Sequence, residues 1–416
     1  MHRYHRRTVT LVASLFFLAL ITLPFQILSG NREGGIPGGA LIVNAPLEAH
    51  AAAESGPALQ VSAKSAILID ADSGKVLYEW NSHEKLPPAS VTKVMTMLLA
   101  MEAIQRGQIA LTDPVTISDR AASMGGSQMY MEAGEIQTLE TLLLGMAVCS
   151  ANDACVATAE HVSGTEEIFV EQMNQRAAEL GMKDTHFVNT NGLPVADHVT
   201  SAYDIAVMSR TLMKFDKPRE WFHIWMTDVT VGLEGKEKTK LGITNTNRLI
   251  KTYPGANGIK TGFTQDAGYC LSASATRGDL TLISVIMGSQ DSKTRFAEAA
   301  RLLDYGFAQY DSVNLGKQGD SFGKILVEKG DPQQIDAICK EPISILVKKG
   351  QREEITSKVE LDSGIHAPLA SDSQVGELVV YQKEKEVQRV PLFASAEVKK
   401  ASYPQLYLRM LNSLVK

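Results

Sequence analysis

The segment from Val91 to Gly107 constrains the fold most, because apolar side chains cover most of the circumference that a helix would have there. Val94, Met95 and Leu98 follow Val91 at helical spacing, and Gly107 is a suitable C-terminal stop. A helix with so little polar surface must be covered by other elements on nearly every side. The sequence therefore predicts a domain built around this helix.

Segments with strand character lie before and after the helical region. Ser65–Trp80 has the pattern of a β-hairpin with a turn at Asp72-Ser73-Gly74. Helices are predicted over 139–148, from Asn152 onward, and over 165–180. Three strands and a last helix are predicted at 257–264, 268–275, 280–287 and 292–305. Strands at both ends with helices between them indicate an α+β fold, with one antiparallel sheet covered by helices.

The sequence pattern changes near Asp311, where helical periodicity ends and Gly, Pro and Asp separate short β-rich runs. These runs are 324–328, 343–348, 377–382 and 387–392. We predict a small all-β domain ending near Ala394, followed by a terminal helix from Ser395 to Lys416.

The terminal helix is amphipathic, with an apolar stripe and basic residues around it. The stripe consists of Tyr403, Leu406, Tyr407, Met410, Leu411 and Leu414, and the basic residues are Lys399, Lys400, Arg409 and Lys416. Such a helix either lies in a membrane surface or docks on the β-rich domain.

The N-terminus has the features of an export signal, since a basic start precedes an apolar run from Val9 to Leu28. The run is near the length of a membrane span, so it is either cleaved or retained as an anchor. In both cases the rest of the chain works outside the cytoplasmic membrane. The predicted regions are a signal or anchor with a linker (1–55), the α+β domain (56–310), the β-rich domain (311–394) and a membrane-associating helix (395–416).

The composition excludes several function classes. The 416 residues carry a net charge of −6, which gives no electrostatic footprint for nucleic acid. The four cysteines and nine histidines form no cluster with metal-site spacing, so we predict neither a metal nor a cofactor. Cys149 and Cys155 are interpreted as small apolar packing residues; a reactive thiol at Cys149 is the less favoured alternative.

Ser90-Val91-Thr92-Lys93 is the first of three motifs with chemical potential. A hydroxyl three residues before a lysine at a helix start places both side chains on one face. Ser90 is the candidate nucleophile and Lys93 the candidate base, provided that burial and a second ammonium from Lys260 lower the pKa of Lys93. If the pattern is considered alone, a helix N-terminus with a solvated lysine is the favoured interpretation.

Ser150-Ala151-Asn152 is the second motif, at the break between two predicted helices. The Ser150 hydroxyl is suited to relay a proton between Lys93 and a leaving group. The Asn152 amide is suited to hold Lys93 or a substrate carbonyl. Helix capping is the alternative for both residues, and it is favoured if the motif is considered alone.

Lys260-Thr261-Gly262 is the third motif, on a predicted strand. An extended peptide can lie antiparallel to that strand, where Gly262 allows close approach and Lys260 with Thr261 binds a carboxylate. The N–H of Phe263 is a candidate oxyanion donor. The alternative is an edge strand protected by a lysine. Arg248 is a weaker carboxylate-binding candidate, for which the alternative is a salt-bridge partner in a loop.

With these motifs the chain resembles the serine D-alanyl-D-alanine carboxypeptidases, the low-molecular-mass penicillin-binding proteins among the SxxK acyltransferases. The resemblance covers 66–306 and rests on Pro87-Pro88-Ala89-Ser90, Ala151-Asn152-Asp153-Ala154, Asn191-Gly192-Leu193, Lys260-Thr261-Gly262-Phe263-Thr264 and Ala267-Gly268-Tyr269. In that family a β-lactamase/transpeptidase-like catalytic domain precedes a β-rich domain and a terminal anchor helix, which favours the membrane interpretation of the last segment.

The resemblance implies a reaction and its partners. The enzyme removes the terminal D-Ala from the pentapeptide stem of peptidoglycan through an acyl-enzyme on Ser90, and β-lactam antibiotics acylate the same serine. It implies that Lys93 is the base, that Ser150 and Asn152 form the second catalytic element, and that Lys260 binds the substrate carboxylate. It also implies an exported enzyme at the outer face of the cytoplasmic membrane.

Two alternatives stay open at this level. A class A β-lactamase uses a further glutamate to activate water, and no Glu-x-x-x-Asn segment lies between Asn152 and Lys260. A non-catalytic cell-wall binding protein would keep the fold, although all the candidate catalytic side chains are present.

Overall fold

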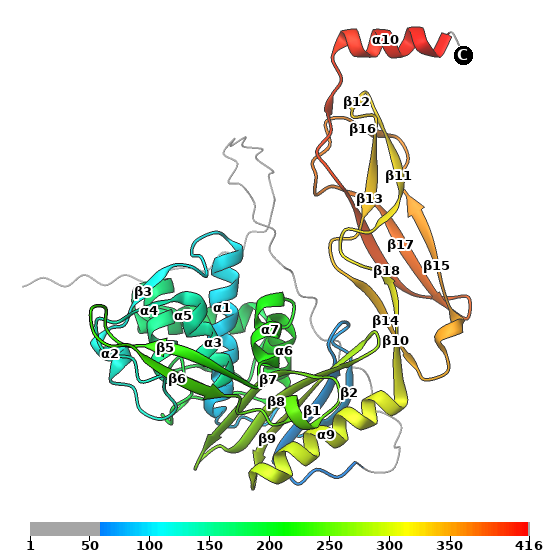
Figure 1. Ribbon diagram of the computed structural model, residues 1–416. Coiled ribbons are helices and arrows are strands. Elements are labelled where there is room, and N and C mark those ends of the chain that lie inside the picture. Colours follow the sequence, from blue (N-terminus) through cyan, green and yellow to red (C-terminus); the bar gives the residue numbers. More distant parts are fainter. Residues whose placement is uncertain (1–58, 415–416) are drawn as a thin grey trace, which may run out of the picture. The chain divides into compact units, whose positions relative to one another are not determined.

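A computed structural model describes residues 59–414 (Figure 1). The predicted export signal, its linker and Lys416 lie outside these residues. The helices are α1 (Lys93–Gln105), α2 (Asp119–Ala122), α3 (Leu139–Val148), α4 (Asn152–Ser163), α5 (Glu166–Glu179), α6 (Ala202–Leu212), α7 (Asp216–His223), α8 (Leu249–Thr252), α9 (Ser292–Gln309) and α10 (Tyr403–Leu414).

The strands of the first part of the chain are β1 (Ser65–Asp70), β2 (Val76–Trp80), β3 (Pro114–Thr116), β4 (Ile136–Thr138), β5 (Met226–Val231), β6 (Thr239–Thr244), β7 (Ala256–Thr264), β8 (Gly268–Arg277) and β9 (Leu280–Ser289). Those of the second part are β10 (Tyr310–Gly316), β11 (Ser321–Glu328), β12 (Gly330–Asp331), β13 (Gln334–Ile338), β14 (Ile343–Lys348), β15 (Ile355–Leu361), β16 (Ile365–His366), β17 (Gln374–Gln382), β18 (Lys385–Ala394) and β19 (Lys399–Lys400).

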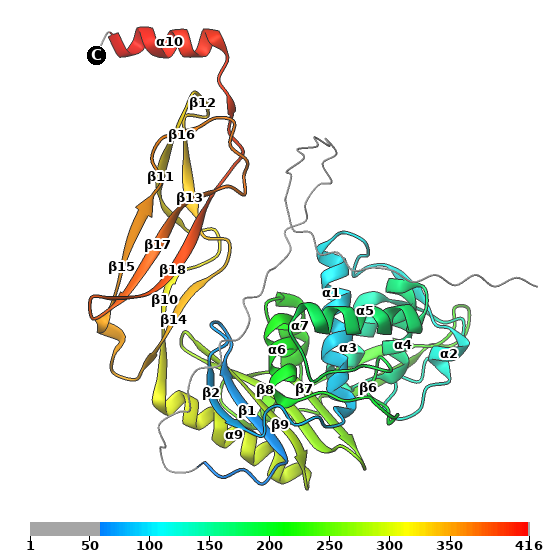
Figure 2. The same ribbon diagram turned by 180° about the vertical axis from the view of Figure 1, so that it is seen from behind.

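A five-stranded antiparallel sheet of order β2-β1-β9-β8-β7 forms the centre of the first part. Successive side chains of a strand point to opposite faces. Ile67 and Ile69 of β1 therefore join the core under α1, α3 and α6, whereas Leu68 joins the core under α9. Figures 1 and 2 show α9 on one face of the sheet and α1, α3 and α6 on the opposite face. The predicted α+β fold is confirmed, with β7 at one edge of the sheet.

The apolar segment after Ser90 forms the predicted central helix. Lys93 and the ten residues after it in α1 are all buried, so the helix is covered on every side. The helix begins later than the pattern predicts, because the four residues Ala89–Thr92 form a 3₁₀ turn before it. Pro87 and Pro88 precede this turn, and their fixed φ angles restrict the path by which the chain enters it.

The second part of the chain is β-rich, as predicted. A sheet of order β15-β17-β18-β13-β11-β16 packs around its own apolar core, and β10 pairs separately with β14. The four predicted runs lie in β11, β14, β17 and β18. The sequence pattern missed β10, β13 and β15, which are short or largely exposed on one face.

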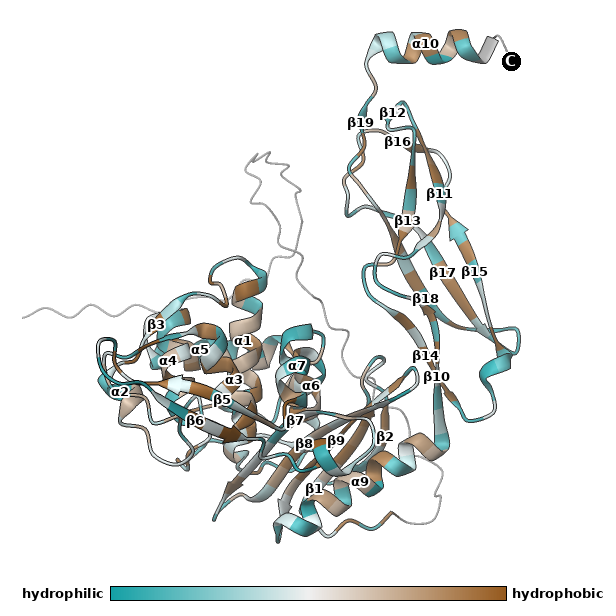
Figure 3. Cartoon of the chain, in the orientation of Figure 1, coloured by the Kyte–Doolittle hydropathy of each residue, from teal (hydrophilic) through white to brown (hydrophobic). Residues whose placement is uncertain are grey.

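The terminal helix α10 presents its apolar stripe to solvent. Tyr403, Tyr407 and Met410 are 90%, 59% and 53% exposed. Two polar side chains from the other face reach β12: Gln405 Nε2 donates to Asp331 Oδ2 at 2.6 Å, and Arg409 Nη1 donates to the Gly330 carbonyl at 2.7 Å. Hydrophobic and hydrophilic residues alternate along α10 in Figure 3. Among residues 59–414, no helix has both the length and the apolar character needed to cross a membrane.

Candidate active site

The first two motifs meet at the amine of Lys93, which is completely buried at the start of α1. Its Nζ lies 3.1 Å from Ser90 Oγ, 2.6 Å from Asn152 Oδ1 and 2.7 Å from the carbonyl oxygen of Asn191. The expected contact between the serine and the lysine is therefore present. Asn152 comes from α4, 59 residues further along the chain.

The contacts of Lys93 determine what its amine can do. Asn152 Nδ2 donates to the Gly125 carbonyl at 2.6 Å, which turns Oδ1 toward Lys93. Oδ1 and the Asn191 carbonyl can only accept, so they occupy two N–H groups of the amine. The third position faces Ser90 Oγ, where a neutral amine would present its lone pair to the serine hydroxyl. Burial lowers the pKa of Lys93 and so favours this neutral form.

Close backbone contacts hold the 3₁₀ turn that bears Ser90. Ala89 has a φ of 48°, a conformation that costs energy for any residue with a Cβ. A Cβ on Gly192 would lie 1.8 Å from the Ala89 carbonyl oxygen, and one on Gly262 would lie 3.1 Å from the Ser90 nitrogen. Gly262 therefore allows the nucleophile turn to pack closely against β7. This role is additional to the one predicted from the motif, in which Gly262 allows the close approach of a substrate.

Ser150 lies at the break between α3 and α4 with a φ of 67°. Its Oγ is buried and, among the described residues, has no hydrogen-bond partner. An unpaired buried hydroxyl is costly unless a ligand uses it. The capping alternative does not describe this motif, because α4 has no side-chain cap and the Asn152 amide faces Lys93 and Gly125 instead.

Lys260 and Thr261 lie on β7, where the charge of Lys93 affects the pKa of Lys260. Lys260 is 1% exposed, and its amine donates to the Thr261 carbonyl at 3.0 Å. Burial lowers the pKa of Lys260 to about 7, and the charge of Lys93 adds to this effect. The sequence predicts that Lys260 in turn lowers the pKa of Lys93, but burial is what lowers it and Lys260 is not among the causes. The Thr261 hydroxyl donates to Thr246 Oγ1 at 2.7 Å.

The side chains beyond the third motif line the edge of the sheet. Phe263 is 52% exposed, and its ring centroid lies 4.3 Å from that of Tyr269 on β8. Arg295 from α9 donates to the carbonyls of Gly262 and Cys270, both at 3.0 Å, and so fixes β7 from behind. Burial lowers the pKa of Arg295 to about 10, and the charge of Arg248 acts in the same direction. Arg248 itself is exposed at the start of α8.

Sequence reasoning assigned no role to four supporting residues. Asn191 contributes a backbone carbonyl, which has no signature in residue type. Thr246 and Arg295 support β7 from segments that carry no recognisable motif. His198 supports the nucleophile turn: its Nε2 lies 2.8 Å from Thr92 Oγ1, and that hydroxyl donates to the Ala89 carbonyl at 2.8 Å.

The surroundings of Cys149 do not favour a reactive thiol. All four cysteines are free. Burial raises the pKa of Cys149 to about 11, which keeps its thiol protonated and unreactive. Within residues 59–414, no group of three His, Cys, Asp or Glu side chains is arranged to hold a metal ion.

Comparisons with known proteins identify the family. Residues 50–291 match the family model described as D-alanyl-D-alanine carboxypeptidase, and residues 310–400 match the C-terminal domain of penicillin-binding protein 5. The chain is 42% identical to the D-alanyl-D-alanine carboxypeptidase DacF of Bacillus subtilis, over 85% of this chain and 90% of that protein. It is 34% identical to DacA of Escherichia coli, over 83% and 85%.

A solved structure agrees with these matches. The crystal structure of penicillin-binding protein 5 from Haemophilus influenzae has a TM-score of 0.64 and 30% identity, and the match covers 84% of this chain and all of that one. Both parts of the chain are therefore those of one known architecture. The chain belongs to the D-alanyl-D-alanine carboxypeptidase family of serine peptidases, the low-molecular-mass penicillin-binding proteins.

Proposed function

We propose that this chain removes the terminal D-alanine from the pentapeptide stem of peptidoglycan through an acyl-enzyme on Ser90. One observation carries the proposal: the buried Lys93 amine has two of its hydrogens directed to fixed acceptors and its remaining position directed at Ser90 Oγ. A neutral amine held in this way is a general base for a nucleophile that is weak without one.

In the acylation step, Ser90 Oγ attacks the carbonyl carbon of the scissile amide while Lys93 takes the hydroxyl proton. The N–H groups of Ser90 and Phe263 are the proposed donors to the oxyanion. The unpaired Ser150 hydroxyl lies at the break beside Asn152. It gives its proton to the leaving nitrogen as the C–N bond breaks and takes the proton that Lys93 accepted from Ser90, so Lys93 becomes neutral again. D-alanine leaves, and the acyl group stays on Ser90.

Binding and deacylation use the same groups. Protonated Lys260 holds the carboxylate of the terminal D-alanine, and the Thr261 hydroxyl redirects its hydrogen from Thr246 Oγ1 to the same carboxylate when the substrate binds. After the D-alanine leaves, water adds to the acyl carbon and Lys93 takes a proton from that water. Lys93 then returns this proton to Ser90 Oγ as the ester bond breaks, which restores the Ser90 hydroxyl and the neutral amine. A β-lactam acylates Ser90 by the same first step and thereby inhibits the enzyme. Arg248 is exposed beside this edge and is proposed as a secondary carboxylate contact.

We further propose that the chain works outside the cytoplasm, held at the membrane surface by α10. The exposed apolar stripe of α10 supports this, because its polar side chains Gln405 and Arg409 contact β12. A helix with its apolar face toward solvent and its polar face toward its own domain is typical of an interfacial anchor. Docking of the apolar stripe on the β-rich domain is not what these contacts favour.

The test of the catalytic proposal is release of D-alanine from diacetyl-L-lysyl-D-alanyl-D-alanine. Wild type should release D-alanine, and Ser90→Ala should not, although it keeps the fold. Ser357→Ala, on an exposed position of β15, is the matched control and should behave as wild type. Fast turnover of penicillin by the wild type, without release of D-alanine, would favour the β-lactamase alternative. Binding of muropeptide by wild type without any hydrolysis would favour the scaffold.

A further inference from the structure

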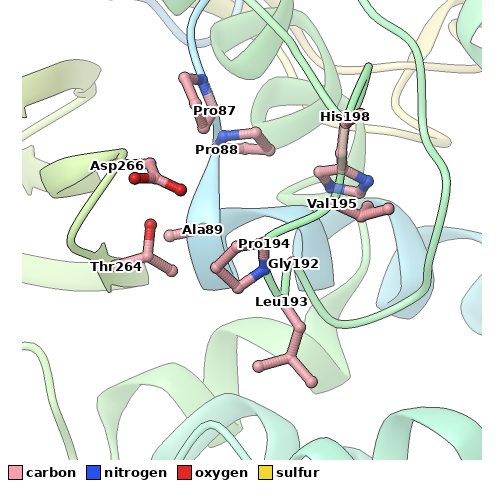
Figure 4. A pocket seen from close by; sticks show the side chains of 11 residues that line it. Pro87, Pro88, Ala89, Gly192, Leu193, Pro194, Val195, His198, Thr264 and Asp266 are labelled. Atoms are coloured by element: carbon pink, nitrogen blue, oxygen red, sulfur yellow. The ribbon is translucent and has the colours of Figure 1, made fainter.

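A pocket of about 300 Å³ lies directly beside the nucleophile turn. Figure 4 shows its three sides: Ala89 of the nucleophile turn, Leu193 and Val195 of the loop after Gly192, and Thr264 with Asp266 at the end of β7. None of the catalytic side chains proposed above lines it. The pocket therefore adjoins the catalytic centre but has no role in the proposed chemistry.

Asp266 is the one carboxylate among the side chains that line the pocket. It is exposed, and the described residues give it neither a hydrogen bond nor an ion pair. Its position is fixed by a turn, in which the Ala267 N–H donates to Thr264 Oγ1 at 3.0 Å. The other walls are mostly apolar, including Leu193 and Val195. The pocket thus combines apolar walls with a single unpaired negative charge.

His198 also lines the pocket but carries no charge near neutral pH. Its Nδ1 accepts from the Val188 N–H at 2.9 Å, so that nitrogen bears no proton. Its Nε2 donates to Thr92 Oγ1, since that hydroxyl uses its own hydrogen for the Ala89 carbonyl. The contact at Nδ1 requires the neutral ring, and burial lowers the pKa of His198 to about 4. The pocket therefore offers no cation to compete for Asp266.

The direction of the bound substrate determines which of its groups reaches this pocket; this step rests on the proposed function. The terminal carboxylate lies at Lys260 and Thr261, and the scissile carbonyl lies between the N–H groups of Ser90 and Phe263. A peptide antiparallel to β7 then continues toward Thr264 with its preceding residue. Each residue advances by roughly 3.3 Å, so the residue before the acyl D-alanine is level with the pocket.

We propose that this pocket binds the side chain of the residue before the acyl D-alanine, and that Asp266 selects an aliphatic side chain that ends in a free ammonium group. The apolar walls receive the methylene stem, and the carboxylate receives the charged end. Long cationic side chains favour this arrangement of a buried stem and an exposed charged head. Capping the amine, or placing a carboxylate beside it, removes the advantage.

The experiment compares two peptides that differ only at the side-chain amine: Nα-acetyl-L-lysyl-D-alanyl-D-alanine and its Nα,Nε-diacetyl form. An exposed ion pair contributes about 0.2–1 kcal/mol, which corresponds to a preference of up to about fivefold in kcat/KM. Wild type should prefer the free amine by about two- to fivefold. Asp266→Asn should reduce the ratio to about one, and Asp266→Lys should reverse it. Asp372→Asn, an exposed carboxylate of the β-rich domain, should keep the wild-type ratio.

Ionic strength gives a second measurement, because screening weakens exposed ion pairs. The wild-type preference should shrink in 0.5 M salt, whereas the Asp266→Asn ratio should not change with salt. A wild-type ratio of one, or a preference that persists in Asp266→Asn, would overturn the assignment of the pocket. Those results leave hydrolysis of the diacetyl peptide intact, so they differ from failure of the proposed function, in which neither peptide is hydrolysed.

Discussion

Replacing Lys93 by methionine separates the chemistry of the amine from its packing. Methionine is unbranched and flexible, so it can follow the path of the lysine stem through the core of α1. The replacement removes the proton acceptor that lies 3.1 Å from Ser90 Oγ. General base catalysis contributes about 10²- to 10⁴-fold, or about 3–5 kcal/mol of the activation barrier. Acylation by penicillin should slow by that factor.

The same replacement has a separate effect on stability. It leaves Asn152 Oδ1 and the Asn191 carbonyl without the donor that each has in the wild type. A buried acceptor without a donor costs about 1–3 kcal/mol, so the two together cost about 2–6 kcal/mol. Removing an amine whose burial already disfavours its charge offsets part of this loss. The variant should therefore remain folded at 25 °C, with a lower melting temperature.

The assay is the second-order rate constant for labelling by a fluorescent penicillin, measured alongside the circular dichroism spectrum and melting curve. Lys75→Met, at an exposed position in the first hairpin, is the matched control and should label at the wild-type rate. Labelling of folded Lys93→Met within threefold of wild type would refute the assignment of Lys93 as the base.

Three further predictions concern the turn, the carboxylate site and the terminal helix. Gly192→Ala should lower the free energy of unfolding in urea far more than Gly181→Ala. Both glycines have a positive φ, which costs about 1–2 kcal/mol for a residue with a Cβ, but only at Gly192 would the Cβ also lie 1.8 Å from a backbone oxygen. Equal losses of stability would contradict the packing of the turn. Lys260 has a pKa of about 7 and binds a carboxylate only when it is protonated, so kcat/KM should fall as the pH rises above about 7. A peptide that ends in an amide should not show this fall. Parallel pH profiles for the two peptides would exclude Lys260 as the carboxylate-binding residue. Tyr407→Glu with Leu411→Glu should reduce sedimentation with anionic lipid vesicles, while two glutamates on the exposed face of the β-rich domain should not; unchanged binding would separate α10 from membrane association.

The residues that sequence reasoning found are those whose roles depend on side-chain type and short spacing. Ser90 and Lys93 lie three residues apart at a helix start, and this spacing alone places them on one face. Leu139–Val148 was predicted with the bounds that α3 has, because apolar residues fill it and polar residues end it. Such signals depend only on neighbouring residues, so they can be recognised in a single sequence.

The residues that were missed act through the backbone or through distant contacts. Asn191-Gly192-Leu193 contributes to the family resemblance, but its role could not be predicted, because a backbone carbonyl would bind Lys93 from any residue type. Arg295 on α9 supports β7 through a hydrogen bond to Gly262, which lies 33 residues earlier in the chain. α6 was also missed, although Ser201 caps it by accepting from the Asp204 N–H, a Ser-x-x-Asp pattern that would have indicated its start.

The central claim is that Ser90 is the group that becomes acylated, and intact-mass analysis with peptide mapping tests it most directly. After incubation with a penicillin, the protein should gain the mass of one ring-opened penicillin, and the adduct should map to the peptide that contains Ser90. Ser90→Ala should gain no mass under the same conditions. An adduct mapped to Ser150 or Cys149, or a mass gain that persists in Ser90→Ala, would contradict the account.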